Sequence, residues 1–166
     1  DILLKDGKRR SFSLANAPHD DEYLELHARN YPGGVFTEHV FTNMKVKDML
    51  RFTGPLGSFF LRDTPEECSI IFLASGTGFA PIKSILEHVF HQEGGRHRKR
   101  NMTLYWGART KSDLYLADLA DKWQREHDNF TFIPVLSEPL PSDNWQGRTG
   151  LVHQAVMHDF LSLEMH

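Results

Sequence analysis

The chain has 166 residues, 40% of them hydrophobic and 25% charged, with a formal net charge of −3; this is ordinary for a globular protein of one domain or two small ones. Residues 1–62 carry nine lysines and arginines against eight carboxylates (+1) and the remainder ten against fourteen (−4), so neither part has the basic surface that nucleic acids require. No apolar run approaches the roughly 20 residues that span a bilayer, and the single cysteine, Cys68, excludes an internal disulfide or a four-cysteine iron–sulfur cluster and fits a cytoplasmic protein.

Short strands and turns fill the first 63 residues. Turn-rich stretches occur at residues 6–7, 16–21 and 54–57. Between them, residues 10–14 are extended, residues 23–28 alternate like a strand, and residues 35–41 are expected to form a short helix. This density of short strands predicts a small antiparallel barrel or sandwich.

The polar stretch at residues 63–67 is the best candidate for a boundary, and we place a first domain at residues 1–63 and a second at 64–166. Beyond the boundary, apolar strands alternate with helical runs, which predicts a parallel sheet covered by helices. The strands are expected at residues 69–74, 103–106 and 131–136, and the helices at 80–91, 112–127 and 150–161.

The most informative motif is Ser75-Gly76-Thr77-Gly78-Phe79-Ala80-Pro81, a strand end followed by a glycine turn and a helix start. Two glycines let the backbone approach a pyrophosphate, and the helix start offers free N–H groups and the positive end of a dipole. Pro81 suits the first helical turn. Ile82 stands where a nucleoside-triphosphate loop needs glycine before Lys83, which excludes that loop. A proline variant of the dinucleotide-binding loop remains.

Two upstream segments have the chemistry of a flavin site. In Arg10-Ser11-Phe12-Ser13, the arginine offers a planar fork of donors to a diphosphate, while Phe12 offers a ring and Ser13 a hydroxyl. Pro32-Gly33-Gly34-Val35-Phe36-Thr37 places glycines and a hydroxyl at the start of a short helix, where an anion can bind. Taken alone, each segment has a simpler explanation: a half-buried strand with an exposed arginine, and a plain turn with a capping threonine.

Two loops follow the second and third strands of the predicted parallel sheet, Tyr105-Trp106-Gly107-Ala108-Arg109 and Ser137-Glu138-Pro139. Ligands of open α/β sheets lie at the carboxyl ends of the strands, so these loops and the glycine turn should face one crevice. There Arg109 would meet a ribose or phosphate, unless it is a plain surface arginine. No metal site is expected, because His88 and His91 lack a completing carboxylate or cysteine.

Seven motifs occur in an order that resembles the ferredoxin–NADP reductase superfamily over nearly the whole chain. Besides the segments above, they include Gly54-Pro55-Leu56-Gly57 and Trp145-Gln146-Gly147-Arg148-Thr149-Gly150. The resemblance is greatest to bacterial NAD(P)H reductases that serve oxygenases or deoxysugar synthesis, and to small flavin reductases. It implies a flavin-binding antiparallel barrel followed by a parallel-sheet domain that binds a nicotinamide nucleotide.

The resemblance also implies roles for individual residues. Arg10 would contact the pyrophosphate of FAD, Phe12 its ring and Ser13 the N5 atom that receives the hydride. Ser13 and Thr77, beside the nicotinamide, would be the catalytic residues. The implied cofactor-binding residues are Arg10, Ser11, Phe12, Ser13, Leu26, His27, Ala28, Gly34, Val35, Phe36, Thr37, Gly76, Thr77, Gly78, Pro81, Gly107, Arg109, Ser137 and Glu138.

Within that set, residues 26–28 would line the ribityl side of the flavin and residues 34–37 would hold its phosphate. The glycine turn would receive the nicotinamide nucleotide, with Arg109 by the adenosine half. NADH is favoured over NADPH, because Asp113 accompanies Arg109 and Lys111.

The implied reaction is hydride transfer from NADH or NADPH to FAD, followed by delivery of single electrons. The acceptor would be an iron–sulfur domain or protein outside these residues, or an oxygenase or dehydrase component. By this resemblance, only the later strands of the flavin-binding barrel are present and the C-terminal strand of the second domain is absent. The chain also begins at Asp1, so we expect an internal fragment of a longer protein whose second domain is truncated at its C-terminus. Two other functions stay open: a flavin reductase that uses free flavin as its substrate, and a non-catalytic nucleotide-binding module.

Overall fold

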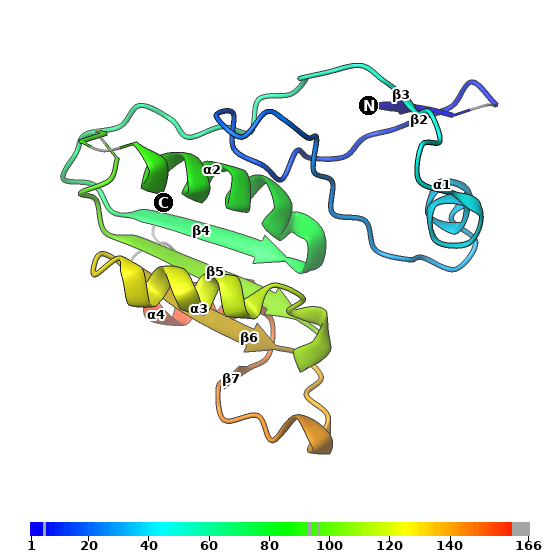
Figure 1. Ribbon diagram of the computed structural model, residues 1–166. Helices are drawn as coiled ribbons and strands as arrows, with labels where there is room; N and C mark the ends of the chain where they lie inside the picture. Colours follow the sequence, from blue (N-terminus) through cyan, green and yellow to red (C-terminus); the bar gives the residue numbers. More distant parts are fainter. Residues whose placement is uncertain (5, 93, 96, 161–166) are drawn as a thin grey trace.

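The computed structural model describes residues 1–4, 6–92, 94–95 and 97–160 (Figure 1). An antiparallel sheet with the strand order β2-β1-β3 is followed by a parallel sheet with the order β4-β5-β6-β7. Figure 1 shows the first sheet at the upper right, set apart from the second sheet, and the second sheet layered between helices. The predicted fold class, an antiparallel β part followed by an α/β part, is confirmed.

The elements of the antiparallel part are short. Its strands are β1 (Ile2–Leu3), β2 (Arg9–Arg10) and β3 (Arg51–Phe52), and helix α1 (Val35–Glu38) continues into a π-helix (His39–Asn43). The parallel part contains β4 (Ile70–Ser75), α2 (Phe79–His91), β5 (Met102–Ala108), α3 (Ala117–Glu126), β6 (Phe130–Leu136), β7 (Arg148–Thr149) and α4 (Val152–Asp159). Short 3₁₀ turns lie at Gly76–Gly78, Lys111–Asp113 and Pro141–Asp143.

The predicted strand at residues 23–28 is wrong: within the described residues this stretch makes a single bridge, between Leu14 and Leu26. The side chain of Asn16 supplies the reason. Its amide donates to the carbonyls of Asp20 and Tyr23 and accepts the backbone N–H of Glu25. Backbone groups bound by a side chain cannot also form a ladder, so the segment is extended but is not a strand.

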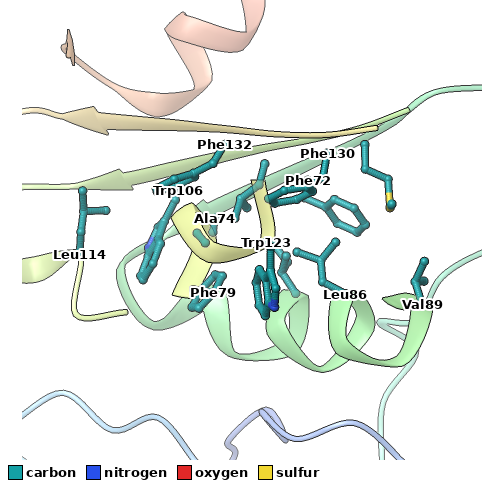
Figure 2. Packing of buried hydrophobic residues seen from close by; sticks show 14 of the residues in the cluster. Phe72, Ala74, Phe79, Leu86, Val89, Trp106, Leu114, Trp123, Phe130 and Phe132 are labelled. Atoms are coloured by element: carbon teal, nitrogen blue, oxygen red, sulfur yellow. The ribbon is translucent and has the colours of Figure 1, made fainter. Parts of the chain in front are cut away.

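The parallel sheet has a hydrophobic core on each face, because side chains along a strand alternate between the faces. On one face, Trp106 and Phe132 pack with Phe79 of α2 and Trp123 of α3, as Figure 2 shows. On the other face, Tyr105 packs against α4 with other apolar residues. The first of these cores holds the glycine turn and α2 in place at the carboxyl end of β4.

Two predicted helices are shorter than expected. The run at residues 112–127 begins as a helix only at Ala117, because a 3₁₀ turn precedes it in which the Asp113 carboxylate accepts the backbone N–H of Thr110 (3.2 Å). The run at 150–161 is helical over α4, and its last residue lies outside the described residues. Among the described residues, no helix has the length and apolar character needed to cross a membrane.

A polar contact fixes α4 to the sheet. The Tyr105 hydroxyl donates to Asp159 Oδ2 (2.6 Å), and Arg148 Nη1 lies 2.8 Å from the same oxygen. The hydrogen bonds from Tyr105 and Arg148 lower the pKa of Asp159 to about 2. Because the pKa is lower in the folded than in the unfolded protein, the carboxylate stabilises the fold above about pH 4, and this contribution is lost as the pH falls toward 2.

Replacing Asp159 by asparagine is therefore expected to lower the melting temperature by about 2–4 °C at pH 7. At pH 2.5 the difference should be clearly smaller, because much of the contribution of the ionised carboxylate is lost as the pH falls toward its pKa of about 2. Thermal unfolding at pH 7, 4 and 2.5 checks this. A difference that persists unchanged at pH 2.5 would contradict an ionised Asp159 as its source.

Candidate functional site

The glycine turn lies between β4 and α2, as the sequence predicts. Gly76 has a φ of +51°, a left-handed conformation that favours glycine, and no atom lies within 4 Å of where a Cβ would stand at Gly76 or Gly78. Pro81 occupies the first turn of α2. The indole Nε1 of Trp106 donates to the Gly76 carbonyl (2.9 Å) and so fixes the turn to the sheet. A buried core thus supports a turn whose open side fits the approach of a ligand.

The carboxyl ends of the parallel strands border one cleft of about 780 Å³. Thr77 lines it beside Gly76, and Gly107, Arg109 and Ser137 line it from the ends of β5 and β6. The predicted convergence of these three loops is therefore present in the structure. His27 and Ala28 also line the cleft, so the first part of the chain contributes one of its walls.

Arg109 is held by a carboxylate at the edge of the cleft. Its Nη2 and Nε lie 2.6 and 3.2 Å from Glu138 Oε2, and both side chains are largely exposed. The hydrogen bond from Arg109 lowers the pKa of Glu138, and Glu138 in turn raises that of Arg109. An exposed pair of this kind contributes little to stability and can open. A phosphate approaching Arg109 would have to compete with Glu138.

Gly107 has a packing reason to be glycine. A Cβ at this position would lie 2.6 Å from Cβ of Val152, at the start of α4. The residue lines the cleft as predicted, but its lack of a side chain is explained by the close approach of α4. Gly76 and Gly78 show the opposite environment, with open space in front of them.

The two predicted flavin segments meet in space. The rings of Phe12 and Phe36 lie 5.3 Å apart, and Phe36 is buried. Ser13 is exposed and has no hydrogen-bond partner among the described residues. The Thr37 hydroxyl donates to the Gly34 carbonyl (3.1 Å), and Gly34 is packed tightly against Thr37. Arg10, in β2, is exposed.

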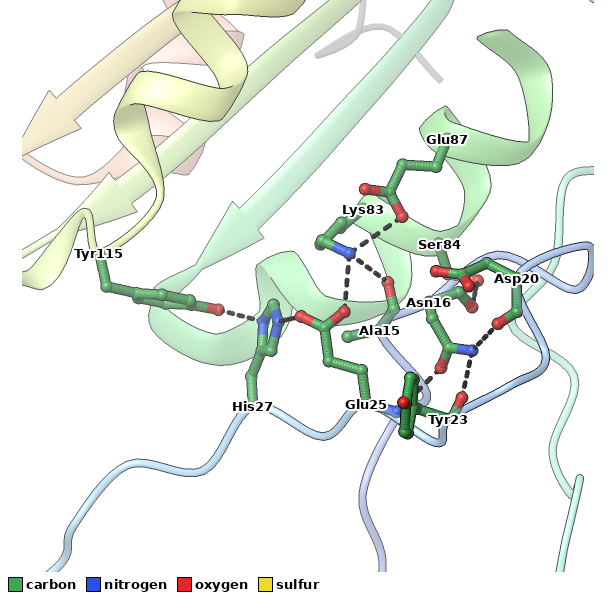
Figure 3. A network of polar contacts seen from close by, with 10 residues as sticks. All are labelled: Ala15, Asn16, Asp20, Tyr23, Glu25, His27, Lys83, Ser84, Glu87 and Tyr115. Carbon is green, nitrogen blue, oxygen red and sulfur yellow. Dashed lines mark hydrogen bonds and ion pairs between the residues drawn. The ribbon is translucent and has the colours of Figure 1, made fainter. Parts of the chain in front are cut away.

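A polar network, drawn in Figure 3, joins this first part to the parallel sheet domain. Lys83 of α2 donates to Glu25 Oε2 (2.9 Å), to Glu87 Oε2 (2.9 Å) and to the carbonyl of Ala15 (3.3 Å). His27 Nε2 lies 2.8 Å from Glu25 Oε1, and its Nδ1 lies 2.6 Å from the Tyr115 hydroxyl. Burial by itself would raise the pKa of Glu25, but the hydrogen bonds from Lys83 and His27 lower it below its usual value.

Sequence reasoning missed Glu25, Lys83 and Tyr115. Lys83 carries a detectable signal, because helical spacing places it on the same face as Ala80 and Leu86, which are buried. A lysine on a buried face needs a partner. Neither Glu25 nor Tyr115 carries such a signal, since their partners lie far along the chain. Among the described residues there is no group of three or more histidine, cysteine, aspartate or glutamate side chains that could hold a metal ion.

Comparisons with known proteins agree with this arrangement. The family model described as "Oxidoreductase NAD-binding domain" matches residues 72–166, and that described as "Oxidoreductase FAD-binding domain" matches residues 3–61. The two matches confirm that the chain contains an FAD-binding part followed by a part that binds a nicotinamide nucleotide, as the sequence predicts.

Curated relatives cover nearly the whole chain. The CDP-6-deoxy-L-threo-D-glycero-4-hexulose-3-dehydrase reductase of Yersinia pestis is 39% identical over 163 residues, covering 98% of this chain and 47% of that protein. Protein RfbI of Salmonella typhimurium is 43% identical over 158 residues, covering 95% of this chain and 45% of that protein. The chain spans about half the length of these relatives.

Among solved structures, the cytochrome P450 reductase GcoB of Amycolatopsis superposes with a TM-score of 0.82 at 34% identity, covering 95% of this chain and 46% of that one. The order of motifs, the two family models and this superposition all point to one family. The chain belongs to the oxidoreductase NAD-binding domain family, within the ferredoxin–NADP reductase superfamily.

Proposed function

We propose that the protein containing this chain is an NAD(P)H-dependent flavoprotein reductase that transfers a hydride from the nicotinamide nucleotide to FAD and then passes on single electrons. The observation that carries the proposal is the cleft, which is lined both by the glycine turn and by His27 and Ala28 of the first part of the chain. The meeting of Phe12 and Phe36 supports a flavin site in the same half of the molecule.

We also propose residues 1–63 and 64–166 as the two domains.

Bound FAD would accept a hydride and release electrons one at a time, which side chains cannot do. The protein's part is to bind and orient. We propose that Arg10 and Ser11 bind the FAD pyrophosphate, that residues 34–37 hold phosphate at the start of α1, and that residues 26–28 line the flavin. The open space before Gly76 and Gly78 supports the glycine turn as the nucleotide's phosphate site.

The second half of the cleft would position the nucleotide. We propose Thr77 beside the nicotinamide and Arg109, with Ser137 and Glu138, beside the adenosine half. The pairing of Arg109 with Glu138 favours NADH. The 2′-phosphate of NADPH would meet a guanidinium whose positive charge is already balanced by Glu138, and the negative charge of Asp113 lies nearby.

Electrons would leave to an iron–sulfur domain or protein, or to an oxygenase or dehydrase component. We also propose a cytoplasmic location. The exposed free thiol of Cys68 supports a reducing compartment. Cell fractionation followed by detection of the protein tests this point.

The test of the function is anaerobic addition of NADH, and then of NADPH, to the purified full-length protein while flavin absorbance is followed. Rapid bleaching of a co-purified flavin supports the proposal, and the faster nucleotide gives the preference. A colourless protein that reduces added flavin would instead be a flavin reductase with flavin as substrate. If the protein neither binds nor reduces flavin, the function that remains is that of a non-catalytic nucleotide-binding module.

Replacing Ser13 by alanine should lower the rate of flavin reduction about fivefold at saturating NADH, because a hydrogen bond to the flavin worth about 1 kcal/mol is lost. Ser13 is exposed, so the melting temperature should not change. Single-turnover reduction measures the rate, and Ser58→Ala, at another exposed serine, is the control. An unchanged rate would remove Ser13 from the proposed site.

A further inference from the structure

Tyr115 and His27 form a contact between the two parts of the chain at the wall of the cleft. Tyr115 lies just after the 3₁₀ turn that follows β5, whereas His27 lies in the extended segment of the first part. Both line the cleft, and the His27 side chain is only 8% exposed. A short hydrogen bond of 2.6 Å and an edge-to-face packing of the rings at 5.2 Å connect them.

The direction of the hydrogen bonds follows from the chemistry of the groups. Glu25 is ionised and can only accept, so Nε2 of His27 carries the hydrogen that Glu25 receives. In the neutral imidazole, Nδ1 is then the acceptor, and the Tyr115 hydroxyl donates to it. Burial and the charge of Glu25 raise the pKa of Tyr115, so the hydroxyl keeps its proton. Lys83 anchors the far end of this chain of bonds.

The same tyrosine is packed against the support of the glycine turn. The Tyr115 ring stands edge-on to Trp106 at 5.2 Å, and Trp106 both stacks on Phe79 at 4.0 Å and donates to the Gly76 carbonyl. One continuous set of contacts therefore runs from the glycine turn through Trp106 and Tyr115 to His27. Its two ends, Gly76 and His27, both line the cleft.

We propose that Tyr115 and His27 are positioning residues that hold the extended segment at residues 25–29 against the glycine turn and so fix the width of the cleft. The inference rests on the proposed function for its catalytic consequence, since flavin and nicotinamide would have to meet in this cleft at a set distance. A misplacement of the reacting groups by about 1 Å can cost a large factor in rate. Neither residue needs to touch the reacting atoms for this role.

Replacing Tyr115 by phenylalanine in the full-length protein with its flavin removes only the hydroxyl and leaves Nδ1 of His27 without its donor. Amide hydrogen exchange at residues 25–29 should become faster, while exchange in α2 stays unchanged. At saturating NADH, the rate of flavin reduction should fall about fivefold, with the affinity for NAD⁺ within about twofold of wild type, because orientation is lost rather than binding.

Tyr105→Phe is the matched control, since it removes a hydroxyl bonded at the same distance, 2.6 Å, on the other face of the sheet. It should change neither the exchange at residues 25–29 nor the reduction rate. His27→Asn tests whether Tyr115 acts through His27. If it does, the flavin of the double variant, Tyr115→Phe with His27→Asn, should be reduced no more slowly than that of the slower single variant.

Several results would overturn the inference. The first is an unchanged rate of amide exchange at residues 25–29 in Tyr115→Phe. The second is an equal effect of Tyr115→Phe and Tyr105→Phe on the rate of flavin reduction. The third is additivity of the effects of Tyr115→Phe and His27→Asn on that rate. A wild-type protein that NADH does not bleach would overturn the proposed function instead. Hydrogen exchange would still decide whether Tyr115 orders the segment.

Discussion

Replacing Lys83 by methionine is expected to lower the free energy of unfolding by about 2–3 kcal/mol at pH 7. The Lys83 side chain is 9% exposed and holds two carboxylates, those of Glu25 and Glu87. Methionine fills the same volume but leaves both carboxylates without their cation. Breaking a fully buried ion pair costs about 3–5 kcal/mol, and the smaller figure applies because Glu25 is 41% exposed and keeps some contact with water.

Acid should reduce the difference between the variant and the wild-type protein. In the wild type, the hydrogen bonds from Lys83 and His27 outweigh burial and keep the pKa of Glu25 low, so its contribution is lost only as the pH falls below the usual carboxyl range. Without Lys83, the effect of burial on Glu25 is no longer offset by the lysine, so the pKa of Glu25 rises. Glu25 of the variant is then protonated at a higher pH, which removes its unpaired charge and with it part of the loss of stability. Urea unfolding at pH 7 and pH 5, followed by tryptophan fluorescence, measures this.

Lys122→Met is the control, since it also removes a helical lysine from an i,i+4 pair with a glutamate. Lys122 and Glu126 are about half exposed and 3.8 Å apart, so the change should stay within about 0.5 kcal/mol. Equal effects of the two substitutions would mean that the network around Lys83 does not join the two parts of the chain in solution.

The features that could be predicted from the sequence depend on neighbours along the chain. The strand, glycine turn and helix at residues 70–91 follow from local spacing, and the parallel sheet follows from the alternation of strands and helices. The meeting of Arg109 with Ser137 at one edge follows from the geometry of parallel strands. Each of these inferences needs only the period of the pattern and the direction of the strand.

What could not be predicted depends on pairs that are distant in the sequence. Tyr115 and His27 are 88 residues apart, and Lys83 and Glu25 are 58 apart. Likewise, the alternation at residues 23–28 indicates a strand, but the side chain of Asn16 takes the backbone groups that a ladder would need. The exchange of a backbone partner for a side-chain partner leaves the local pattern unchanged, so no periodicity reveals it.

Replacing Gly78 by alanine is expected to weaken NAD⁺ binding to the full-length protein at least about tenfold, or 1.4 kcal/mol, while leaving stability within about 0.5 kcal/mol. Gly78 has a φ of −59°, which any residue adopts, and no atom lies within 4 Å of the added Cβ. The fold therefore gives no reason for a glycine here. The reason would be the ligand, because a methyl group at this place keeps a phosphate away from the backbone N–H groups at the start of α2.

Gly107→Ala provides the contrasting control, because its Cβ would collide with Val152 at 2.6 Å. This variant should lose about 1–3 kcal/mol of stability through overpacking, and the loss should appear in the unfolding curve of the ligand-free protein. Calorimetric titration with NAD⁺ and unfolding of both variants separate the two kinds of glycine. If Gly78→Ala binds NAD⁺ as tightly as the wild-type protein, the nucleotide does not approach the glycine turn, and the proposed use of the cleft fails with it.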